Sequence, residues 1–232
     1  MTFTPKYSTP SLEVTDASGH WRIYNKSHQT QRKMKKLFWL MSIIILAVLV
    51  IWQIVANSIS AETKQRAREY AAKAEAYCQQ NGYRTDYCFL VDFDVHSGKN
   101  RFFVWDFEKE KIVYRTICIH GHGGGSTYEK PILSNKPGSK CSSAGRYKIG
   151  RTLRMNSHPN MHCIEVDGLD STCSNARRRA ILIHPSAWQF ATYPIPVMWR
   201  TAGCFGTSLR AFRKLDEYKN MSNKPMLLWA YK

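Results

Sequence analysis

The chain has 232 residues, of which 44% are apolar and 12% aromatic, so it can build a folded core and is not disordered throughout. Its 34 Lys and Arg residues against 17 Asp and Glu give a net charge of +17, which predicts a polyanionic partner such as nucleic acid or an acidic surface. The seven cysteines argue against a nucleic-acid partner if they form disulfides. Disulfides belong to oxidising compartments, whereas nucleic-acid binders work where thiols stay reduced. Their odd number leaves one thiol over after complete pairing.

Residues 1–36 carry Ser, Thr, Pro and scattered charges without an apolar period, which predicts a disordered tail. The next stretch, residues 37–56, reads LFWLMSIIILAVLVIWQIVA and has no charged side chain, enough apolar length to cross a hydrocarbon core of about 30 Å. A soluble helix of this length would show a polar face, and the apolar region of a cleaved signal peptide is only about 7–15 residues long. We therefore predict a single transmembrane helix.

The charges that flank this helix predict its orientation. The N-terminal flank is crowded with basic residues, namely Lys26, Arg32, Lys33, Lys35 and Lys36. The first basic residue on the other side is Lys64, so the positive-inside bias predicts a cytoplasmic tail and places residues 57–232 outside the membrane. The seven cysteines then lie in the oxidising exterior, where DNA and RNA are not the expected partners.

The exported part is itself cationic. The tail holds seven basic and two acidic residues, which leaves 27 basic and 15 acidic residues, or +12, from Leu37 onward. Outside the inner membrane of a bacterium, the anionic polymers available to such a surface are the cell-wall glycopeptide and phospholipid headgroups.

The exported part divides into a helix and a mainly β domain. Within residues 57–82, the segment 61–80 is rich in Ala, Glu, Lys and Gln and precedes Asn81-Gly82, which predicts a solvated helical stalk. From residue 83 onward apolar and polar residues alternate, which predicts antiparallel strands near residues 89–95, 103–107, 112–119, 146–149, 163–166, 180–184 and 226–231. One helix is expected between Thr207 and Asn220, capped by Thr207 or Ser208.

The segment RTAGCFGT, residues 200–207, is the most reactive-looking part of the chain. Cys204 lies on a glycine-flanked turn just before the predicted helix, and both a helix N-terminus and the Arg200 guanidinium favour a thiolate. Gly203 permits close backbone approach, so amide N–H groups of this turn are suited to stabilising an oxyanion. The alternative is a structural or disulfide-bonded cysteine.

His184 is the candidate base for this cysteine. It ends the apolar strand 180–183 and lies 20 positions before Cys204, so the intervening loop is long enough to return the cysteine to the strand end. The alternative is a strand-end histidine bonded to the backbone.

Two cofactor sites suggested by the sequence are disfavoured. The run HGHGGGS, residues 120–126, lacks the Gly-Lys-Ser/Thr ending of a nucleotide-binding loop. Zinc would need ligands among His120, His122, His158 and His162, but Pro159 interrupts the last pair and the chain has neither HExxH nor C-x-x-C. We expect no metal and no organic cofactor.

Four short motifs occur in order over residues 112–216: His120-Gly121, SNKPGS with SSAGRY at 134–147, RRAILIH at 178–184 and RTAGC at 200–204. This set resembles YkuD-type murein L,D-transpeptidase catalytic domains, most closely the subfamily with an HGKGS-like loop and a GRSxGC-like nucleophile turn. The resemblance implies a β-sandwich or barrel with a few helices over residues 83–232, preceded by the transmembrane helix and the stalk.

The resemblance also implies a reaction. In that family a cysteine thiolate attacks the peptide bond after the third, diamino-acid residue of a peptidoglycan stem peptide, D-Ala leaves, and an amine or water resolves the thioester. Carried over, Cys204 is the nucleophile and His184 the general base. The remaining carried-over roles are the oxyanion hole (Gly203 and Cys204 N–H), the shape of the turn (Arg200 and Thr201) and the substrate pocket (His120 and Tyr147).

Three positions depart from the family pattern. Ala202 replaces the histidine of the widespread Ser-His-Gly-Cys motif, although the better-matching subfamily also varies there. Gly206 stands where Asn or Arg is common, and Pro185 follows His184 where many relatives have glycine. The substrate contacts and the group that orients the imidazole are therefore expected to differ.

With Cys204 left free, six cysteines remain, an even number that allows 15 connectivities. Cys78–Cys88 and Cys163–Cys173 are the expected local bridges.

These observations predict a single-pass cysteine acyltransferase of the bacterial inner membrane, with an extracytoplasmic domain that acts on peptidoglycan stem peptides. Two alternatives stay open: hydrolysis of the same substrate, as an L,D-carboxypeptidase or endopeptidase, and a non-catalytic cell-wall-binding protein held by its positive charge.

Overall fold

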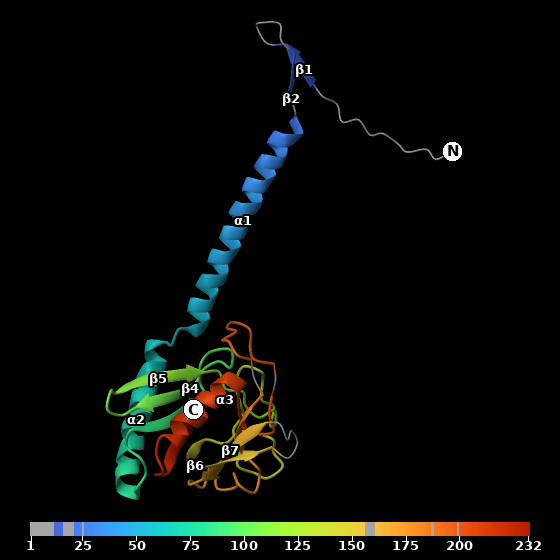
Figure 1. Ribbon diagram of the computed structural model, residues 1–232. Coiled ribbons are helices and arrows are strands. Elements are labelled where there is room, and N and C mark those ends of the chain that lie inside the picture. The colour runs from blue at the N-terminus through green and yellow to red at the C-terminus, as the bar shows by residue number, and fades with distance from the viewer. Residues whose placement is uncertain (1–11, 16–20, 25, 156–160, 187, 199) are drawn as a thin grey trace. The chain divides into compact units, whose positions relative to one another are not determined.

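The computed structural model describes residues 12–15, 21–24, 26–155, 161–186, 188–198 and 200–232, with side chains from Thr30 onward (Figure 1). The chain forms two compact units, residues 1–52 and 53–232. In the first unit, β1 (Leu12–Thr15) pairs antiparallel with β2 (Trp21–Tyr24), and α1 (Lys26–Asn57) follows. Of the tail predicted to be disordered, residues 1–11, 16–20 and 25 lie outside the described residues, whereas β1, β2 and the first 11 residues of α1 are ordered elements within it.

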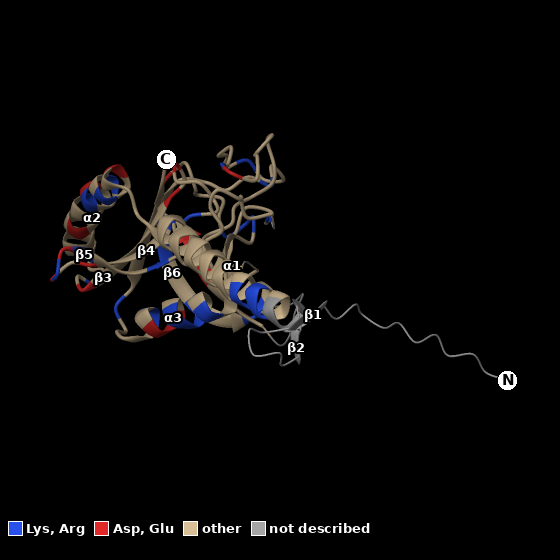
Figure 2. Cartoon of the chain, turned by 90° about the horizontal axis from the view of Figure 1, so that it is seen from above, with Lys and Arg blue, Asp and Glu red and all other residues tan. Residues whose placement is uncertain are grey.

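The helix expected at residues 37–56 is present within α1. Among the described residues, one helical stretch, which includes α1, has the length and hydropathy to cross a membrane, and none of its apolar window is buried. Figure 2 shows the basic residues gathered at the start of α1, before the uncharged stretch.

The second unit has two helices, α2 (Ala61–Asn81) and α3 (Leu209–Asn220), and a sheet of eight strands. The strands are β3 (Tyr87–Asp92), β4 (Phe102–Asp106), β5 (Lys111–Thr116), β6 (Gly145–Arg154), β7 (His162–Gly168), β8 (Leu182–Pro185), β9 (Phe205–Thr207) and β10 (Met226–Tyr231). Their order in the sheet is β5-β4-β3-β10-β6-β7-β8-β9. The mainly β fold predicted from the alternating pattern is confirmed, and the last strand of the chain, β10, lies in the middle of the sheet.

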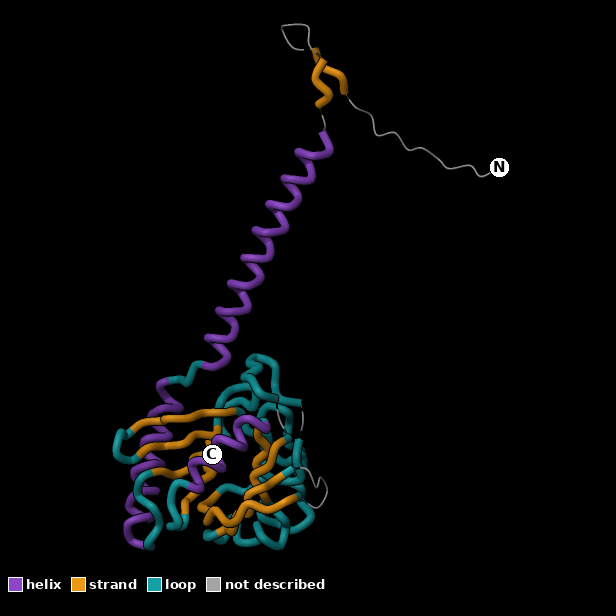
Figure 3. The backbone as a smooth tube through the Cα atoms, viewed as in Figure 1, coloured by secondary structure: helices purple, strands orange, loops and turns teal. Residues whose placement is uncertain are grey.

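Alternate residues of the strands are buried on opposite faces of this sheet. In β3, Cys88 and Leu90 pack toward α2, whereas Phe89 and Val91 belong to the main core together with Phe212 of α3. Residues of β7, β8 and β9 line the same main core, so the sheet curls around it as a barrel-like layer (Figure 3). The curled sheet brings the ends of β8 and β9 next to one another.

The predicted helix at residues 61–80 is present, but it is a layer of the domain instead of a solvated stalk. Its Ser60 cap accepts a hydrogen bond from Thr63 N–H, and it ends at Gly82, whose φ of +72° suits a residue without Cβ. One face is buried against the sheet through Ala67, Ala71, Ala74 and Cys78. These small side chains give a weak hydrophobic signal in the sequence, but they let the helix approach the strands closely.

Ala56 and Asn57, at the end of α1, are both held by contacts with other residues of the second unit. The Ala56 side chain is fully buried, and the Asn57 side-chain oxygen accepts a hydrogen bond of 3.1 Å from Asn100. Ala56 packs in a small cluster with Ile117, Ile119, Ala191 and Val197. Only Ser58, Ile59 and Ser60 separate the end of α1 from the start of α2.

All seven cysteines are free thiols, so neither predicted disulfide is formed. Cys78 and Cys88 lie in one apolar cluster, where burial raises the pKa of Cys78 to about 12 and that of Cys88 well above its usual value, which keeps both thiols protonated. Cys173 is buried in the main core and donates to the Arg146 carbonyl at 3.2 Å, whereas Cys163 lies on β7.

Candidate active site

The two predicted catalytic residues lie on or next to the paired strands β8 and β9. The strands are parallel, and His184 stands opposite Gly206 in the register. Cys204 directly precedes β9, two residues before Gly206, the residue that pairs with His184.

The proline after His184 supplies a group that orients the imidazole. His184 Nδ1 lies 3.3 Å from the main-chain oxygen of Pro185. Because a carbonyl oxygen only accepts, this contact puts the hydrogen of the neutral ring on Nδ1 and the basic lone pair on Nε2.

The surroundings of Cys204 differ from those expected. Its Sγ lies 3.5 Å from the main-chain oxygen of Ala180, and burial raises the pKa of the thiol, against the opposing effects of the Leu182 N–H and the Arg179 guanidinium. Strand β9 separates Cys204 from α3, which begins only at Leu209, so no helix N-terminus lies directly after the cysteine. Burial therefore favours the protonated thiol at Cys204 over the thiolate.

The nucleophile turn is closed by the side chain of Thr201. Its Oγ1 accepts a hydrogen bond of 3.1 Å from Gly203 N–H and donates one of 2.9 Å to the Cys204 carbonyl. Gly203 has a φ of +125°, and a Cβ at this position would lie 2.6 Å from the main-chain oxygen of Cys141. Glycine is therefore the only residue that fits this corner without displacing its neighbours.

Arg200 joins the turn to the glycine-rich loop. It donates to the Ser126 carbonyl at 2.7 Å, and its guanidinium lies over the Tyr128 ring, 3.9 Å from the centroid. It is Arg179 that provides the positive charge acting on Cys204.

His120, predicted to line the substrate pocket, lies in the interior. His120 is only 1% exposed. Its Nε2 donates to the Thr127 carbonyl at 2.8 Å, and its Nδ1 accepts from Arg101 at 2.5 Å. Burial and the Arg101 charge lower the pKa of His120 to about 3, so the ring is neutral. The main-chain oxygen of His120 accepts from Thr201 N–H at 2.9 Å, so this residue supports the nucleophile turn from below.

Tyr147, the other predicted pocket residue, is also buried. Its hydroxyl donates to the Ser143 carbonyl at 2.9 Å, and its ring packs edge-on against Phe205, with the centroids 5.4 Å apart. It thus supports the residue that follows Cys204. Of the four histidines considered as zinc ligands, His158 lies outside the described residues.

Two residues near Cys204 were not predicted to act there. Arg179 donates to the Ser134 carbonyl at 2.9 Å, to Ser143 Oγ at 2.7 Å and to the Cys141 carbonyl, so it ties the loop 134–143 to the site. His122 is exposed, and its Nδ1 donates to the Thr201 carbonyl at 2.8 Å, beside the turn. The arginine run at 177–179 does not reveal which member points inward, and His122 belongs to a glycine run without a secondary-structure period.

A profile of the L,D-transpeptidase catalytic domain (YkuD_2) matches residues 60–230. The chain belongs to this L,D-transpeptidase family. The matched range includes α2, in agreement with its packing on the sheet.

Several solved structures are similar to this chain. An L,D-transpeptidase from Mycobacterium smegmatis is 12% identical over 63% of this chain and 59% of its own, with a TM-score of 0.36. One from Xylanimonas cellulosilytica is 14% identical over 67% and 68%, with a TM-score of 0.39. The helical cell shape determining protein Pgp2 from Campylobacter jejuni is 10% identical over 75% and 57%, with a TM-score of 0.43. The chain thus spans less than two thirds of the first and third of these proteins, and no curated protein matches it significantly.

Proposed function

We propose that this chain is a membrane-anchored cysteine peptidyltransferase that acts on peptidoglycan stem peptides through a thioester. The observation that supports the proposal is the parallel β8–β9 register, in which His184 pairs with Gly206, two residues after Cys204. Membership of the L,D-transpeptidase family supports the substrate class.

The raised pKa of Cys204 favours general-base attack over a preformed ion pair. His184 Nε2 takes the thiol proton as Sγ bonds to the carbonyl carbon of the diamino-acid residue. The C–N bond to D-Ala then breaks, and the imidazolium returns the proton to the departing amine. An acceptor amine or water resolves the thioester by the reverse sequence.

The backbone of the nucleophile turn supplies the oxyanion contact. Gly203 N–H already donates to Thr201 Oγ1 at 3.1 Å, so we assign this contact to the Cys204 N–H. Thr201 and Gly203 hold that N–H in place, and Arg179 offsets part of the cost of charging the sulfur.

The membrane anchor is the apolar stretch of α1, with the basic flank in the cytoplasm and residues 57–232 outside. Trypsin added to intact spheroplasts is expected to digest the domain and leave an N-terminal epitope protected. Protection of the domain, or loss of the epitope before lysis, would reverse the assignment.

The decisive experiment is the digestion of isolated sacculi with the full-length protein in detergent, followed by muropeptide analysis. New 3–3 cross-links establish transfer, tripeptide stems without cross-links establish a carboxypeptidase, and cleaved 3–3 cross-links establish an endopeptidase. Each change is expected to vanish in Cys204→Ala. An unchanged muropeptide profile together with salt-sensitive binding would identify a non-catalytic wall-binding protein.

A carbapenem tests the nucleophile directly, since it acylates the cysteine of this family. Intact-protein mass spectrometry is expected to give one adduct that maps to Cys204 and is missing in Cys204→Ala. No adduct, or an adduct that survives this substitution, would contradict the assignment.

A further inference from the structure

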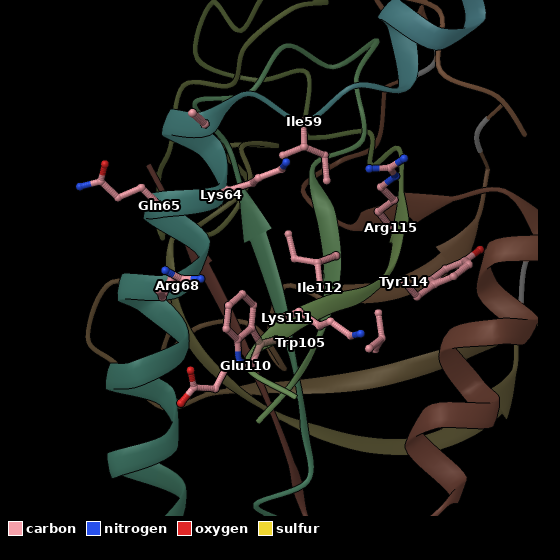
Figure 4. A pocket seen from close by; sticks show the side chains of 12 residues that line it. Ile59, Lys64, Gln65, Arg68, Trp105, Glu110, Lys111, Ile112, Tyr114 and Arg115 are labelled. Carbon is pink, nitrogen blue, oxygen red and sulfur yellow. The ribbon is translucent and has the colours of Figure 1, made fainter. Parts of the chain in front are cut away.

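A cavity of about 870 Å³ lies between the start of α2 and the edge strand β5, away from the β8–β9 edge that carries Cys204 (Figure 4). Its apolar lining comes from Ile59, Trp105, Ile112, Val113 and Tyr114. Four cations stand around this lining, Lys64 and Arg68 from α2 and Lys111 and Arg115 from β5, against the single carboxylate of Glu110. The cavity therefore combines an apolar floor with a cationic rim.

In the part of the chain that the structure describes, the four cations are not engaged in ion pairs. Among the described residues, none of their side chains forms an ion pair or a hydrogen bond. The neighbouring Arg66 differs, because it pairs with Glu62 at 2.6 Å and with Asp92 at 2.8 Å. Unpaired like charges around an apolar hollow attract an anion that also carries apolar groups.

The cavity lies close to the end of the apolar segment. Ile59 lines it and follows Asn57, the last residue of α1, by two positions. Each residue spans at most about 3.6 Å, so Ile59 lies within roughly 11 Å of Ala56, whose side chain is packed into the domain. If α1 crosses the membrane, this short connection keeps Ile59, which lines the cavity, near the lipid headgroups.

A second apolar feature adjoins the cavity. The loop 188–198 exposes Trp188 (55%), Phe190 (63%), Ile195 (58%) and Met198 (62%). Phe190 lines a smaller hollow of about 250 Å³ together with Tyr114 and Arg115, which also line the large cavity. Exposed aromatic side chains beside basic residues are typical of surfaces at a membrane interface.

We propose that the cavity between α2 and β5 binds the headgroup of an anionic phospholipid of the membrane in which α1 is anchored. The lipid phosphate pairs with the cations of the two walls, and the glycerol and first methylene groups cover Trp105 and Ile112. This inference rests on the proposed membrane anchoring and is independent of the catalytic assignment.

The lipid-binding proposal is tested by native mass spectrometry. The full-length protein in detergent is titrated with phosphatidylglycerol and, separately, with phosphatidylcholine. The wild-type protein is expected to bind one phosphatidylglycerol more tightly than phosphatidylcholine. Lys64→Gln with Arg115→Gln, which removes one cation from each wall, is expected to weaken this binding roughly tenfold or more. Arg68→Gln with Lys111→Gln provides a second pair in case the first does not fold.

The matched control is Arg213→Gln with Lys224→Gln, which removes the same charge from exposed positions outside the cavity. It is expected to bind like the wild-type protein. Equal affinity for the two lipids, equal losses in the cavity and control pairs, or complete displacement by millimolar inorganic phosphate would each overturn the proposal. Because no outcome depends on turnover, a failure here is distinguishable from a failure of the catalytic proposal.

Discussion

The Thr201 hydroxyl donates a hydrogen bond of 2.9 Å to the main-chain oxygen of Cys204. The same hydroxyl accepts from Gly203 N–H, and the Thr201 main chain is held by His120 and His122. The position of the nucleophile thus depends on a side chain three residues earlier and on a loop more than 75 residues away in sequence.

Thr201→Val should reduce the rate of carbapenem acylation about 10- to 100-fold, because it preserves the shape of the side chain but removes both hydrogen bonds that close the turn. Thr201→Ser retains the hydroxyl and should recover most of the rate. The measurement is the time course of the Cys204 adduct by mass spectrometry. Equal rates for the valine and serine variants would show that the hydroxyl does not position the nucleophile.

Arg179→Gln should raise the pKa of Cys204 further, because the guanidinium charge opposes the effect of burial. A shift of one pKa unit slows alkylation by iodoacetamide roughly tenfold at neutral pH. The pH dependence of Cys204 alkylation, mapped by peptide mass spectrometry, should therefore move to higher pH. Arg179→Lys should largely restore it.

Arg178→Gln is the matched control for this variant, since Arg178 is the exposed neighbour in the same run. An identical alkylation profile for the Arg178 and Arg179 variants would mean that a general loss of charge, and not the contact with the site, governs the thiol.

Gly203→Ala should destabilise the domain and abolish acylation, because its Cβ would lie 2.6 Å from the Cys141 carbonyl. Gly125→Ala is the comparison: Gly125 also has a positive φ, +79°, but its Cβ would meet nothing within 4 Å. The free energy of unfolding in urea should fall by about 1–3 kcal/mol more for Gly203→Ala than for Gly125→Ala. Equal losses would leave backbone strain, and not the contact with Cys141, as the cause.

The neutral His120 should make the domain less stable in acid. Burial and Arg101 lower the pKa of His120 to about 3, whereas the unfolded chain takes up this proton near pH 6.5. The contribution of the neutral His120 ring to the free energy of unfolding is complete above pH 6.5. It is lost as the pH falls toward 3, at up to about 1.4 kcal/mol per pH unit. Urea unfolding between pH 4 and 7 should show a shallower pH dependence for His120→Gln than for the wild-type protein. Parallel curves would contradict the assignment.

The local patterns were sufficient for most of the secondary structure. Period-two alternation identified the strands, and the Ser208 side chain does cap α3, accepting from Ala211 N–H at 3.1 Å. The parallel insertion of β10 beside β3 was not predicted, because the pairing of Leu228 with Phe89 joins residues too far apart for any local pattern. Strand β9 has only three residues, too few for a period to be recognised.

The candidate site was predictable in its chemistry and less so in its surroundings. Cys204 and His184 belong to motifs whose spacing suits a strand-end pair, and the structure has His184 on β8 and Cys204 directly before the neighbouring strand β9. Whether His120 and Tyr147 face a pocket or the interior depends on partners distant in the chain, such as Arg101 for His120. Which of the three consecutive arginines lies near Cys204 depends on the path of the loop 134–143, to which Arg179 donates its hydrogen bonds. No sequence pattern predicts that path.

If α1 is the membrane anchor proposed above, the packing of α2 limits how far from the bilayer the domain can reach. A free helix of this length would act as a spacer of about 30 Å, but α2 lies along the sheet, and three residues join it to α1. A unit the size of residues 53–232 is roughly 40 Å across, so that dimension would set the outer limit for an anchored domain. An anchored enzyme of this design would be restricted to the innermost stem peptides of the wall.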